Sequence, residues 1–451
     1  MSAPVTSLDE VESEIPEVEA GHAVAKVSQR DAPIAVALAH RVAWAILIAR
    51  LGFFDLLEVL RARSINDYGS FHAAAVAIAH GLDPYSPTDL AIAAQAVDLP
   101  APHPYFYPPL LAELLLPLTL LRAFPARLVW MALSVGAFVG ALVLLNRWLA
   151  RRLVGPRADL AQAALLVVTC AMWPLRSTQW MAQVNALVLL AIVAWWTERD
   201  RSPRAAAVFL ALAAAVKMSP VLLLLVPLTQ RRWRELLWSA GTTAVLVLGS
   251  CAVLGTRGLR FLGDVLLGFL PGHRYHGLNV SIDIPGNHSI GALSFWLFDR
   301  PRHMDPHHLS PRAAAFHLAV VGALLLVWLA RSLWGATQDG RTAALIVLMI
   351  VAPTFAFEHH VTFAVLPIAL VIVLLVEGSL GRFALGVSLA AFALLTEHEA
   401  AFLPPAHVKP WVVMLGHVSK LLPLLALFAV GLFARRVGRL DLSSAAGDDA
   451  Q

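Results

Sequence analysis

Apolar runs separated by short polar segments fill most of the chain, from Ala43 to Phe433. A helix that crosses a bilayer needs about 20 predominantly apolar residues, and runs of that kind recur throughout this region. The alternating pattern of a membrane β-strand is absent, so every spanning element is expected to be a helix. We therefore predict an all-α bundle of roughly 12 transmembrane helices, an integral membrane protein.

Two apolar stretches depart from this simple pattern. Residues 205–229 are broken by "KMSP" and form either one span or two short half-helices that meet at Lys217. The placement of arginines at both ends of the stretch favours the pair. Residues 105–125 are interrupted by Pro117, which favours a juxtamembrane or re-entrant helix over a full span.

The composition agrees with a polytopic membrane protein. Of the 451 residues, 59% are hydrophobic and 14% are charged, and the mean hydropathy of +0.70 lies well above that of a soluble domain. The two cysteines, Cys170 and Cys251, lie inside apolar runs and are not placed for a disulfide or a metal site. A nucleotide-binding site is not indicated, because the chain has neither a Rossmann fingerprint nor a Gly-rich phosphate loop.

Arginines near helix ends account for the formal net charge of +4, and they predict sidedness before they suggest a nucleic-acid surface. The positive-inside rule assigns to the cytoplasm residues 146–157, 198–204, 230–234 and 434–439. The bundle then occupies residues 36–436, with a first outer loop at 61–126 and a long outer loop at 255–312. The acidic residues 1–35, which lack the apolar core of a signal peptide, and residues 437–451 are expected to be disordered cytoplasmic tails.

The first outer loop begins with a carboxylate directly after the first span. Asp67 precedes the helical-looking "YGSFHAAAVAIAHG" and the turn "GLDPY", which contains Tyr85. A carboxylate held at the membrane surface suits a general base that takes a proton from a hydroxyl. It also suits an N-cap of the following helix, and spacing alone favours capping.

Lys217 is a cation inside an apolar stretch. Charges within a membrane are costly and usually face a cavity or a partner, so a lysine there suits an anionic group such as a lipid phosphate. Snorkelling of the side chain to the interface explains Lys217 equally well.

Several amide and imidazole side chains fall in segments that are expected on the same outer face. Gln183 and Asn185, in "MAQVNALVLL", suit hydrogen bonds to sugar hydroxyls, although bonds to other helices are more frequent. In the long outer loop, "PGNHS" contributes Asn287 and His288. The cluster "RHMDPHHLS" is more typical of a solvated turn than of a metal site, and no Asp-x-Asp pair occurs in an outer loop. We therefore expect a metal-independent protein without a cofactor.

The stretch "FAFEHHV" interrupts an apolar run with Glu358, His359 and His360. Either histidine can carry a positive charge or donate a hydrogen bond to a phosphate, and Glu358 could fix the tautomer of one of them. The alternative is a polar hairpin tip at the membrane interface. That alternative is weaker because the other candidate residues are expected on the same face.

Six motifs occur in the order that is typical of one enzyme family: "DYGSFHAAAVAIAHGLDPY", "YFYPPL" with the proline and tryptophan that follow, "QVN", "KMSP", "GNHS" and "EHH". Together they span most of residues 66–360. With them the chain resembles glycosyltransferase family 87 of the GT-C type, which includes mycobacterial mannosyltransferases acting on phosphatidylinositol mannosides. The chain departs from the family in His288, where glutamine is usual, and in "FAF", where a Ser-Trp pair is usual.

The resemblance implies roles for the candidate residues. Asp67 would be the catalytic base, and His359 or His360 would lie near the donor phosphate. The residues implied in the donor pocket with them are Lys217, Asn185, Gln183 and Asn287. Those implied in support of the site or at the acceptor are Glu358, Tyr107, Tyr85 and His288.

The implied activity is an inverting transfer of mannose from a polyprenyl-phosphate-mannose donor to a mannosylated lipid or glycan acceptor. It would occur on the extracytoplasmic face of a bacterial cytoplasmic membrane, with both termini in the cytoplasm, and would form an α-linkage. Membrane lipids and the two substrates would be the partners, and no nucleic acid would bind. Alternatives are another polyprenyl phosphosugar donor (glucose or arabinofuranose), a transporter or lipid flippase, or a structural scaffold. No internal repeat of the kind that transporters show is evident.

Overall fold

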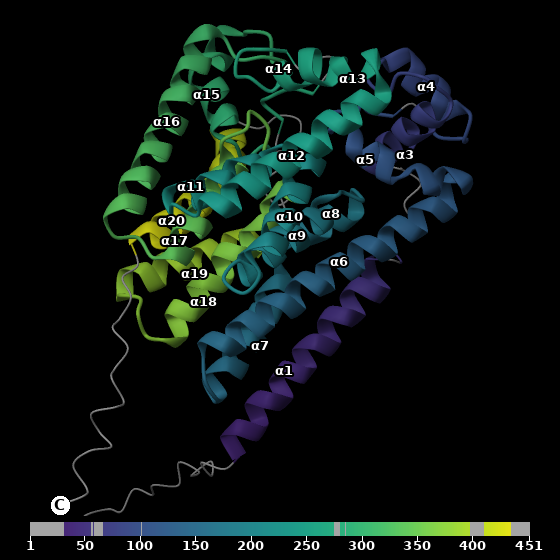
Figure 1. Cartoon of the computed structure of the whole chain (residues 1–451). Coiled ribbons are helices and arrows are strands. Elements are labelled where there is room, and N and C mark those ends of the chain that lie inside the picture. The colour runs from purple at the N-terminus through teal and green to yellow at the C-terminus, as the bar shows by residue number, and fades with distance from the viewer. Residues whose placement is uncertain are drawn as a thin grey trace, which may run out of the picture.

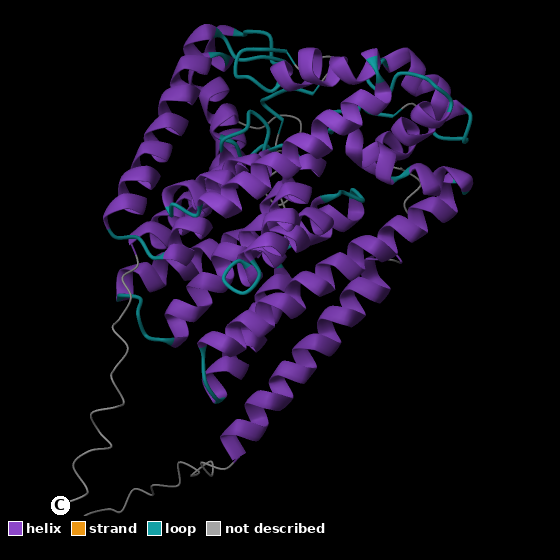
Figure 2. Ribbon diagram, viewed as in Figure 1, coloured by secondary structure: helices purple, strands orange, loops and turns teal. Residues whose placement is uncertain are grey.

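The structure is a computed structural model that describes residues 31–55, 57, 66–100, 102–274, 280–284, 286–396 and 410–433. Within these residues every regular element is a helix, as the apolar pattern predicts, and none is a strand (Figure 2). The first helix begins at Asp31, so the last residues of the predicted N-terminal tail are helical. The rest of that tail, loop residues 58–65 and the tail at 437–451 lie outside the described residues.

The first half of the chain contains the longest helix and a series of shorter ones. In chain order these are α1 (Asp31–Ala49), η1 (Arg50–Asp55), α3 (Asn66–Ala79), α4 (Pro87–Gln95), α5 (Pro109–Leu114), η2 (Leu116–Leu120), α6 (Ala123–Arg152), α7 (Pro156–Ala171), α8 (Trp173–Trp180), α9 (Asn185–Glu198), α10 (Pro203–Val216), η3 (Ser219–Leu224) and α11 (Leu225–Thr229).

The second half begins with a long helix and a loop region that carries short helices. Its elements are α12 (Trp233–Leu254), α13 (Thr256–Arg260), η4 (Phe261–Val265), α14 (Leu266–Gly268), α15 (Ile290–Phe298), η5 (Arg300–Arg302), α16 (Pro311–Trp334), α17 (Gln338–Val351), η6 (Glu358–Ala364), α18 (Val365–Val376), α19 (Arg382–Thr396) and α20 (Pro410–Phe433).

By length and composition, 6 described helices can cross a membrane, or 7 if the bent pair α7 and α8 forms one span. Their ranges are 35–53, 123–152, 233–254, 311–334, 358–376 and 414–433. The sequence prediction of roughly 12 spans is therefore not confirmed. The difference arises because several apolar runs form helices of only 10–17 residues, at 185–198, 203–216, 219–229 and 384–396.

Prolines explain two of these short elements. Helix α10 ends at Val216, Lys217 is extended, and the 3₁₀ helix η3 begins at Ser219 with Pro220 as its second residue. A proline has no N–H and disfavours the helical conformation of the residue before it, so the chain cannot continue as one α-helix. In residues 105–125 the chain forms α5, η2 with Pro117 as its second residue, and the first residues of α6, rather than one span.

Helices α9, α17 and α18 form the centre of the bundle. Helix α9 packs between α6 and α10, and α17 packs against α18 and α20. Nearly every side chain of α17 and α18 is buried, whereas α12 and α16 expose large apolar side chains such as Val253 and Leu326. Helices that are apolar all round are typical of a core, and outward apolar side chains are typical of a surface that faces lipid.

One end of the bundle collects most of the short helices. Figure 1 shows α3, α4, α5, α13 and α14 together at this end, which we call the short-helix end. The long helices α6 and α12 run from it toward the opposite end. Segments that the arginine pattern predicts on one face of the membrane therefore lie at one end of the molecule.

Helices α17 and α20 approach each other closely at two glycines. A Cβ atom on Gly340 would clash with the carbonyl oxygen of Gly431. A Cβ atom on Gly431 would lie 3.0 Å from the carbonyl oxygen of Gly340. Small residues allow helix backbones to come this close in membrane proteins. The contact fixes α20 against α17.

Candidate active site

Asp67 lies in the first turn of α3 and is partly buried. It is the second residue of the helix, not its N-cap, and its Oδ2 accepts a hydrogen bond from Nε2 of Gln183. The capping interpretation is therefore wrong. Among the described residues, Gln183 is the one hydrogen-bond partner of the Asp67 carboxylate.

Gln183 is held on both sides. Oη of Tyr107 donates to Oε1 of Gln183 at 2.9 Å, while Nε2 of Gln183 donates to Asp67. Its backbone is fixed as well, because Nε1 of Trp130 donates at 2.8 Å to the carbonyl of Ala182, which has a positive φ of 50°. Since the amide oxygen is used by Tyr107, only the NH₂ group can face Asp67.

Lys217 points into the protein. Its Nζ donates to Oδ1 of Asn185 at 2.7 Å and lies 5.5 Å from the centroid of the Tyr107 ring, and the residue is only 8% exposed. Snorkelling to the interface is therefore wrong for Lys217. Nδ2 of Asn185 in turn donates to the carbonyl of His359 at 2.7 Å, so the first residue of α9 joins Lys217 to η6.

The surroundings of Asp67 change its acid strength. Burial away from water raises the pKa of Asp67 above its usual value, against smaller opposing effects of the Gln183 hydrogen bond and of the charges of His103 and Lys217. A carboxylate whose pKa is raised is a stronger base than a free aspartate. Asp67 is thus suited to take a proton.

The two histidines of η6 have different roles in the structure. The carbonyl of His359 accepts from Asn185 and, at 3.2 Å, from Oγ1 of Thr178. Nδ1 of His360 accepts from the backbone N–H of Phe357 at 3.1 Å. A neutral His360 therefore carries its proton on Nε2 and can donate from that atom. His360 is partly exposed, whereas His359 is buried.

Glu358 does not contact either histidine beside it among the hydrogen bonds of the described residues. Both of its carboxylate oxygens accept from Nζ of Lys420 at 2.5 Å, and Oε1 lies 3.0 Å from Nε2 of His288. The prediction that Glu358 fixes the tautomer of His359 or His360 is wrong. His288 belongs to this buried group, in the supporting position that is one of its two implied roles.

Sequence reasoning did not identify Lys420 or Thr178, and it included Trp130 only as part of a motif, without a role. For Lys420 the signal was present, because it is a lysine inside the apolar helix α20, as Lys217 is inside its own apolar stretch. Thr178 acts through a hydroxyl within an ordinary helix, and no spacing in the sequence marks it. The motif that contains Trp130 does not indicate that its indole N–H donates to the carbonyl of Ala182.

Asn287 holds backbone segments together. Its Nδ2 donates to the carbonyls of Ile282 and Thr354 at 3.0 and 3.1 Å, and its Oδ1 accepts from the N–H of Ala356 at 2.9 Å. The amide is thus used by backbone groups, in place of the predicted sugar contact. Asn287 fastens the long loop to the segment that precedes Glu358.

Two further predicted positions lie at the edge of this arrangement. Oη of Tyr85 donates to the carbonyl of Tyr107 at 2.9 Å, so Tyr85 supports the segment that carries Tyr107. In the loop cluster "RHMDPHHLS", Asp305 pairs with Arg274 and accepts from the N–H of His307. These residues form a surface turn.

Comparison with known proteins gives a consistent result. The sequence profile of glycosyltransferase family 87 matches residues 105–357, a range that contains Tyr107, Gln183, Asn185 and Lys217 and ends just before Glu358. Over 250 residues, 53% of each chain, the sequence is 28% identical to the polyprenol-phosphate-mannose-dependent alpha-(1-2)-phosphatidylinositol pentamannoside mannosyltransferase of Mycolicibacterium smegmatis. The protein of the same name from Mycobacterium tuberculosis is 28% identical over 174 residues, 37% of each chain. The matched part spans about half the length of the first relative.

Proposed function

Because the chain belongs to glycosyltransferase family 87, we propose that it is a membrane glycosyltransferase that moves mannose from a polyprenyl-phosphate-mannose donor to a lipid-linked or glycan acceptor. The names of the two relatives support this donor and a phosphatidylinositol mannoside as the kind of acceptor. The proposed acceptor is accordingly a mannosylated lipid.

One observation carries the proposal. Gln183 and Asn185, two positions apart at the start of α9, hold a carboxylate and a cation respectively. Asp67 would receive the proton of the acceptor hydroxyl, and Lys217 would face the phosphate of the donor. A base and a cation fixed by one short segment suit a reaction in which one side of the substrate loses a proton and the other gains negative charge.

The proposed reaction is a single displacement. The acceptor oxygen forms a bond to the anomeric carbon while its proton passes to Asp67. The bond from that carbon to the phosphate oxygen breaks, and the polyprenyl phosphate leaves with the bonding electrons. Lys217 and Nε2 of His360 stabilise the charge on the departing phosphate. Attack from the opposite side inverts the configuration, so a β-linked donor gives an α-linked product, and the steps use no metal ion.

We also propose that the reaction takes place on the extracytoplasmic face. In support, Arg152, Arg199 and Arg232 belong to connections far along α6, α9 and α12 from the short-helix end, and arginine-rich connections are typically cytoplasmic. The four shorter apolar helices would then lie in the membrane with the six longer ones, and both termini would be cytoplasmic. This arrangement approaches the roughly 12 spans expected from hydropathy.

The test uses purified protein in lipid nanodiscs. Polyprenyl-phosphate-mannose and a mannosylated lipid are supplied, and transfer by the wild type is compared with that by Asp67→Asn. The matched control is Asp98→Asn, an exposed aspartate with a positive φ of 56°, a conformation that asparagine also tolerates. We expect transfer by the wild type and by the control, and loss in Asp67→Asn.

Two results would contradict this proposal. If the wild type transfers no sugar from mannose, glucose or arabinofuranose donors, the glycosyltransferase activity is wrong. If it transfers sugar and Asp67→Asn retains normal turnover, another group is the base. Transfer from the glucose or arabinofuranose donor alone would change the sugar and leave the mechanism.

A further inference from the structure

Helix α20 carries a lysine that is wholly inside the protein. Lys420 is 0% exposed, and its Nζ lies 2.5 Å from both carboxylate oxygens of Glu358, which is 3% exposed. Nε2 of His288 lies 3.0 Å from one of the same oxygens. The last helix, η6 and the long loop thus meet at one buried charged group.

A buried ion pair is an inefficient way to join two helices. Removing two charges from water carries a large desolvation penalty, and apolar residues of the same size are often at least as stabilising. The pair instead fixes the orientation of the Glu358 side chain, because both carboxylate oxygens accept from the same Nζ. This distinguishes the pair from the apolar contacts that surround it.

Glu358 is the first residue of η6, immediately before the two histidines. The contacts that hold this turn include Lys420 at the side chain of Glu358, Asn185 at the carbonyl of His359, and the N–H of Phe357 at the ring of His360. The first of these uses a residue of α20, which contributes none of the groups proposed to contact the substrates.

We propose that Lys420 is a positioning residue, which acts through Glu358 to hold the η6 turn so that Nε2 of His360 faces the lipid phosphate. The inference rests on the proposed function. It extends the site to α20, which lies outside the segment matched by the family profile.

Neighbouring hydrogen bonds also connect α20 to the long loop, in addition to its contact with η6. One turn before Lys420, the ring of His417 lies 3.1 Å from the carbonyl of Asn287 and 3.2 Å from Oδ1 of Asp283. Asn287 binds Thr354 and Ala356, just ahead of Glu358. The same face of α20 therefore supports η6 directly and through the long loop.

The experiment distinguishes the effect of an unpaired buried charge from the effect of a displaced η6 turn. Lys420→Met alone leaves a buried carboxylate without its cation and is expected to be unstable. The informative variants are the double variant Glu358→Gln with Lys420→Met, which removes both charges, and Glu358→Asp, which keeps both charges but shortens the link by one methylene. The matched control is Asp339→Asn with Arg199→Met, which neutralises a buried pair at the opposite end of α17.

Two quantities are measured in nanodiscs for each variant. One is the affinity for polyprenyl phosphate, which needs no turnover, and the other is kcat/KM for polyprenyl-phosphate-mannose, together with the melting temperature. In the double variant and in Glu358→Asp we expect both quantities to fall between about tenfold and a hundredfold, the loss typical of a displaced catalytic group. The control pair should change both less than about twofold, a loss below that of a single hydrogen bond.

The outcomes are distinct. If the double variant binds polyprenyl phosphate as tightly as the wild type, Lys420 does not position the η6 turn and the proposal is wrong. If the wild type binds the phosphate but transfers no sugar, the proposed function fails while the affinity comparison still decides the role of Lys420. A wild type that does not bind polyprenyl phosphate overturns both.

Discussion

Two polar clusters lie at opposite ends of α9. Each contains a buried or partly buried carboxylate, and the two carboxylates differ in the donors that surround them. At one end Asp67 accepts from one neutral amide, Gln183. At the other end Asp339 accepts from Arg152, from Arg199 at 3.1 Å and from Nε1 of Trp196 at 2.8 Å. Asp339 is thus bound in ion pairs with two arginines, whereas Asp67, with a single neutral donor, keeps the capacity to take a proton.

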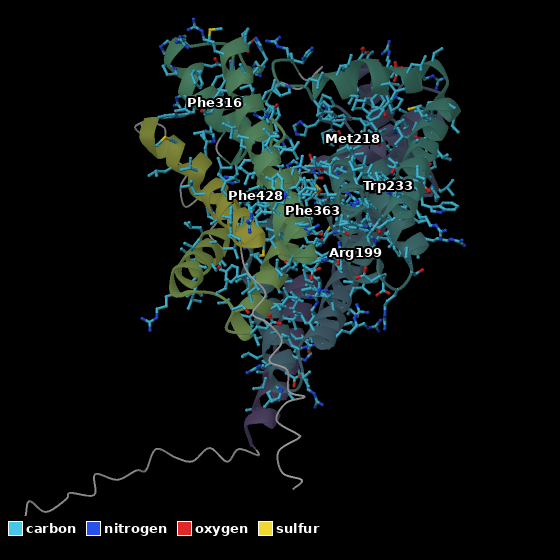
Figure 3. The ribbon with its side chains drawn as sticks, turned by 60° about the vertical axis from the view of Figure 1, so that its left-hand side comes forward. Arg199, Met218, Trp233, Phe316, Phe363 and Phe428 are labelled. Atoms are coloured by element: carbon cyan, nitrogen blue, oxygen red, sulfur yellow. The ribbon has the colours of Figure 1, made fainter. Side chains whose placement is uncertain are left out.

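The clusters are separated by the length of a helix. Helix α9, whose two ends carry the clusters, has 14 residues and is therefore about 21 Å long. Figure 3 shows Met218, the neighbour of Lys217, nearer the short-helix end and Arg199 nearer the opposite end. Similar residue types thus serve two purposes: the Asp67 cluster carries the proposed chemistry, and the Asp339 cluster joins α6, α9 and α17.

The largest expected effect is that substitution of Asp67 lowers turnover without lowering stability, whereas substitution of Asp339 lowers stability without lowering turnover. Asp67→Asn should lower kcat by about a thousandfold through loss of the base, without lowering the melting temperature, because asparagine still accepts from Gln183. Asp339→Asn should leave kcat of the folded protein unchanged and destabilise it by about 3 kcal/mol, because two arginines lose their anion. Turnover and thermal unfolding of both variants check this. Equal effects on both quantities would abolish the distinction between the clusters.

The cations should differ in the same way. Lys217→Met is expected to lower kcat/KM for the donor by about a hundredfold, because a positive charge near the departing phosphate is lost. Arg199→Met should lower stability and leave donor kinetics intact, since Arg199 contacts Asp339 and Thr342 and no proposed substrate group. Steady-state kinetics with varied donor, alongside thermal unfolding, test this pair. A change of acceptor kinetics alone in Lys217→Met would contradict the phosphate contact.

The pH dependence should report Asp67. Because burial raises its pKa, kcat/KM should fall about tenfold for each pH unit below that pKa, and the fall should begin above the usual range of aspartate. For stability the sign is the reverse. A carboxyl whose pKa is higher in the folded than in the unfolded protein favours folding at acid pH, and this contribution is lost as pH rises through the folded value. Asp67→Asn should remove both dependences, as pH profiles of rate and melting temperature would show.

The smallest expected effect lies one step from the base. Tyr107→Phe removes the hydrogen bond that fixes the Gln183 amide, and should lower kcat about fivefold to tenfold. Tyr105→Phe is the control, because Oη of Tyr105 binds only the backbone of Pro108 and Ala112 among the described residues. It should reduce stability without changing kcat. The reverse order of effects on kcat would place the support of the base elsewhere.

Much of this arrangement follows from the sequence, because a polar residue in an apolar run must have a partner. That reasoning identified Asp67, Gln183, Asn185 and Lys217, which the structure connects. It does not provide the partner: Glu358 and Lys420 are 62 positions apart, and their pairing depends on how α20 packs. Sequence reasoning also cannot tell whether an amide such as that of Asn287 binds backbone groups or faces a ligand; in the structure it binds backbone groups.

The predicted number of spans stays unconfirmed for a related reason. Hydropathy counts apolar residues and is insensitive to the points at which a helix must stop. Lys217 and Pro220 divide one apolar stretch, and Met172 with Pro174 bends another by 55° between α7 and α8. One of these breaks places Lys217, and the other precedes the turn that carries Gln183. The interruptions that shorten the helices therefore also position the site.

The close contact of Gly340 with Gly431 has a mechanical consequence. It acts as a stop that sets how far α20 can slide along α17. Lys420 lies 11 positions before Gly431, about 16 Å along the helix axis, so a slip of one residue at the glycines would move the ammonium group about 1.5 Å from Glu358. Bulky side chains at Gly340 or Gly431 should therefore weaken the contact between Lys420 and Glu358, although they are introduced far from it along α20.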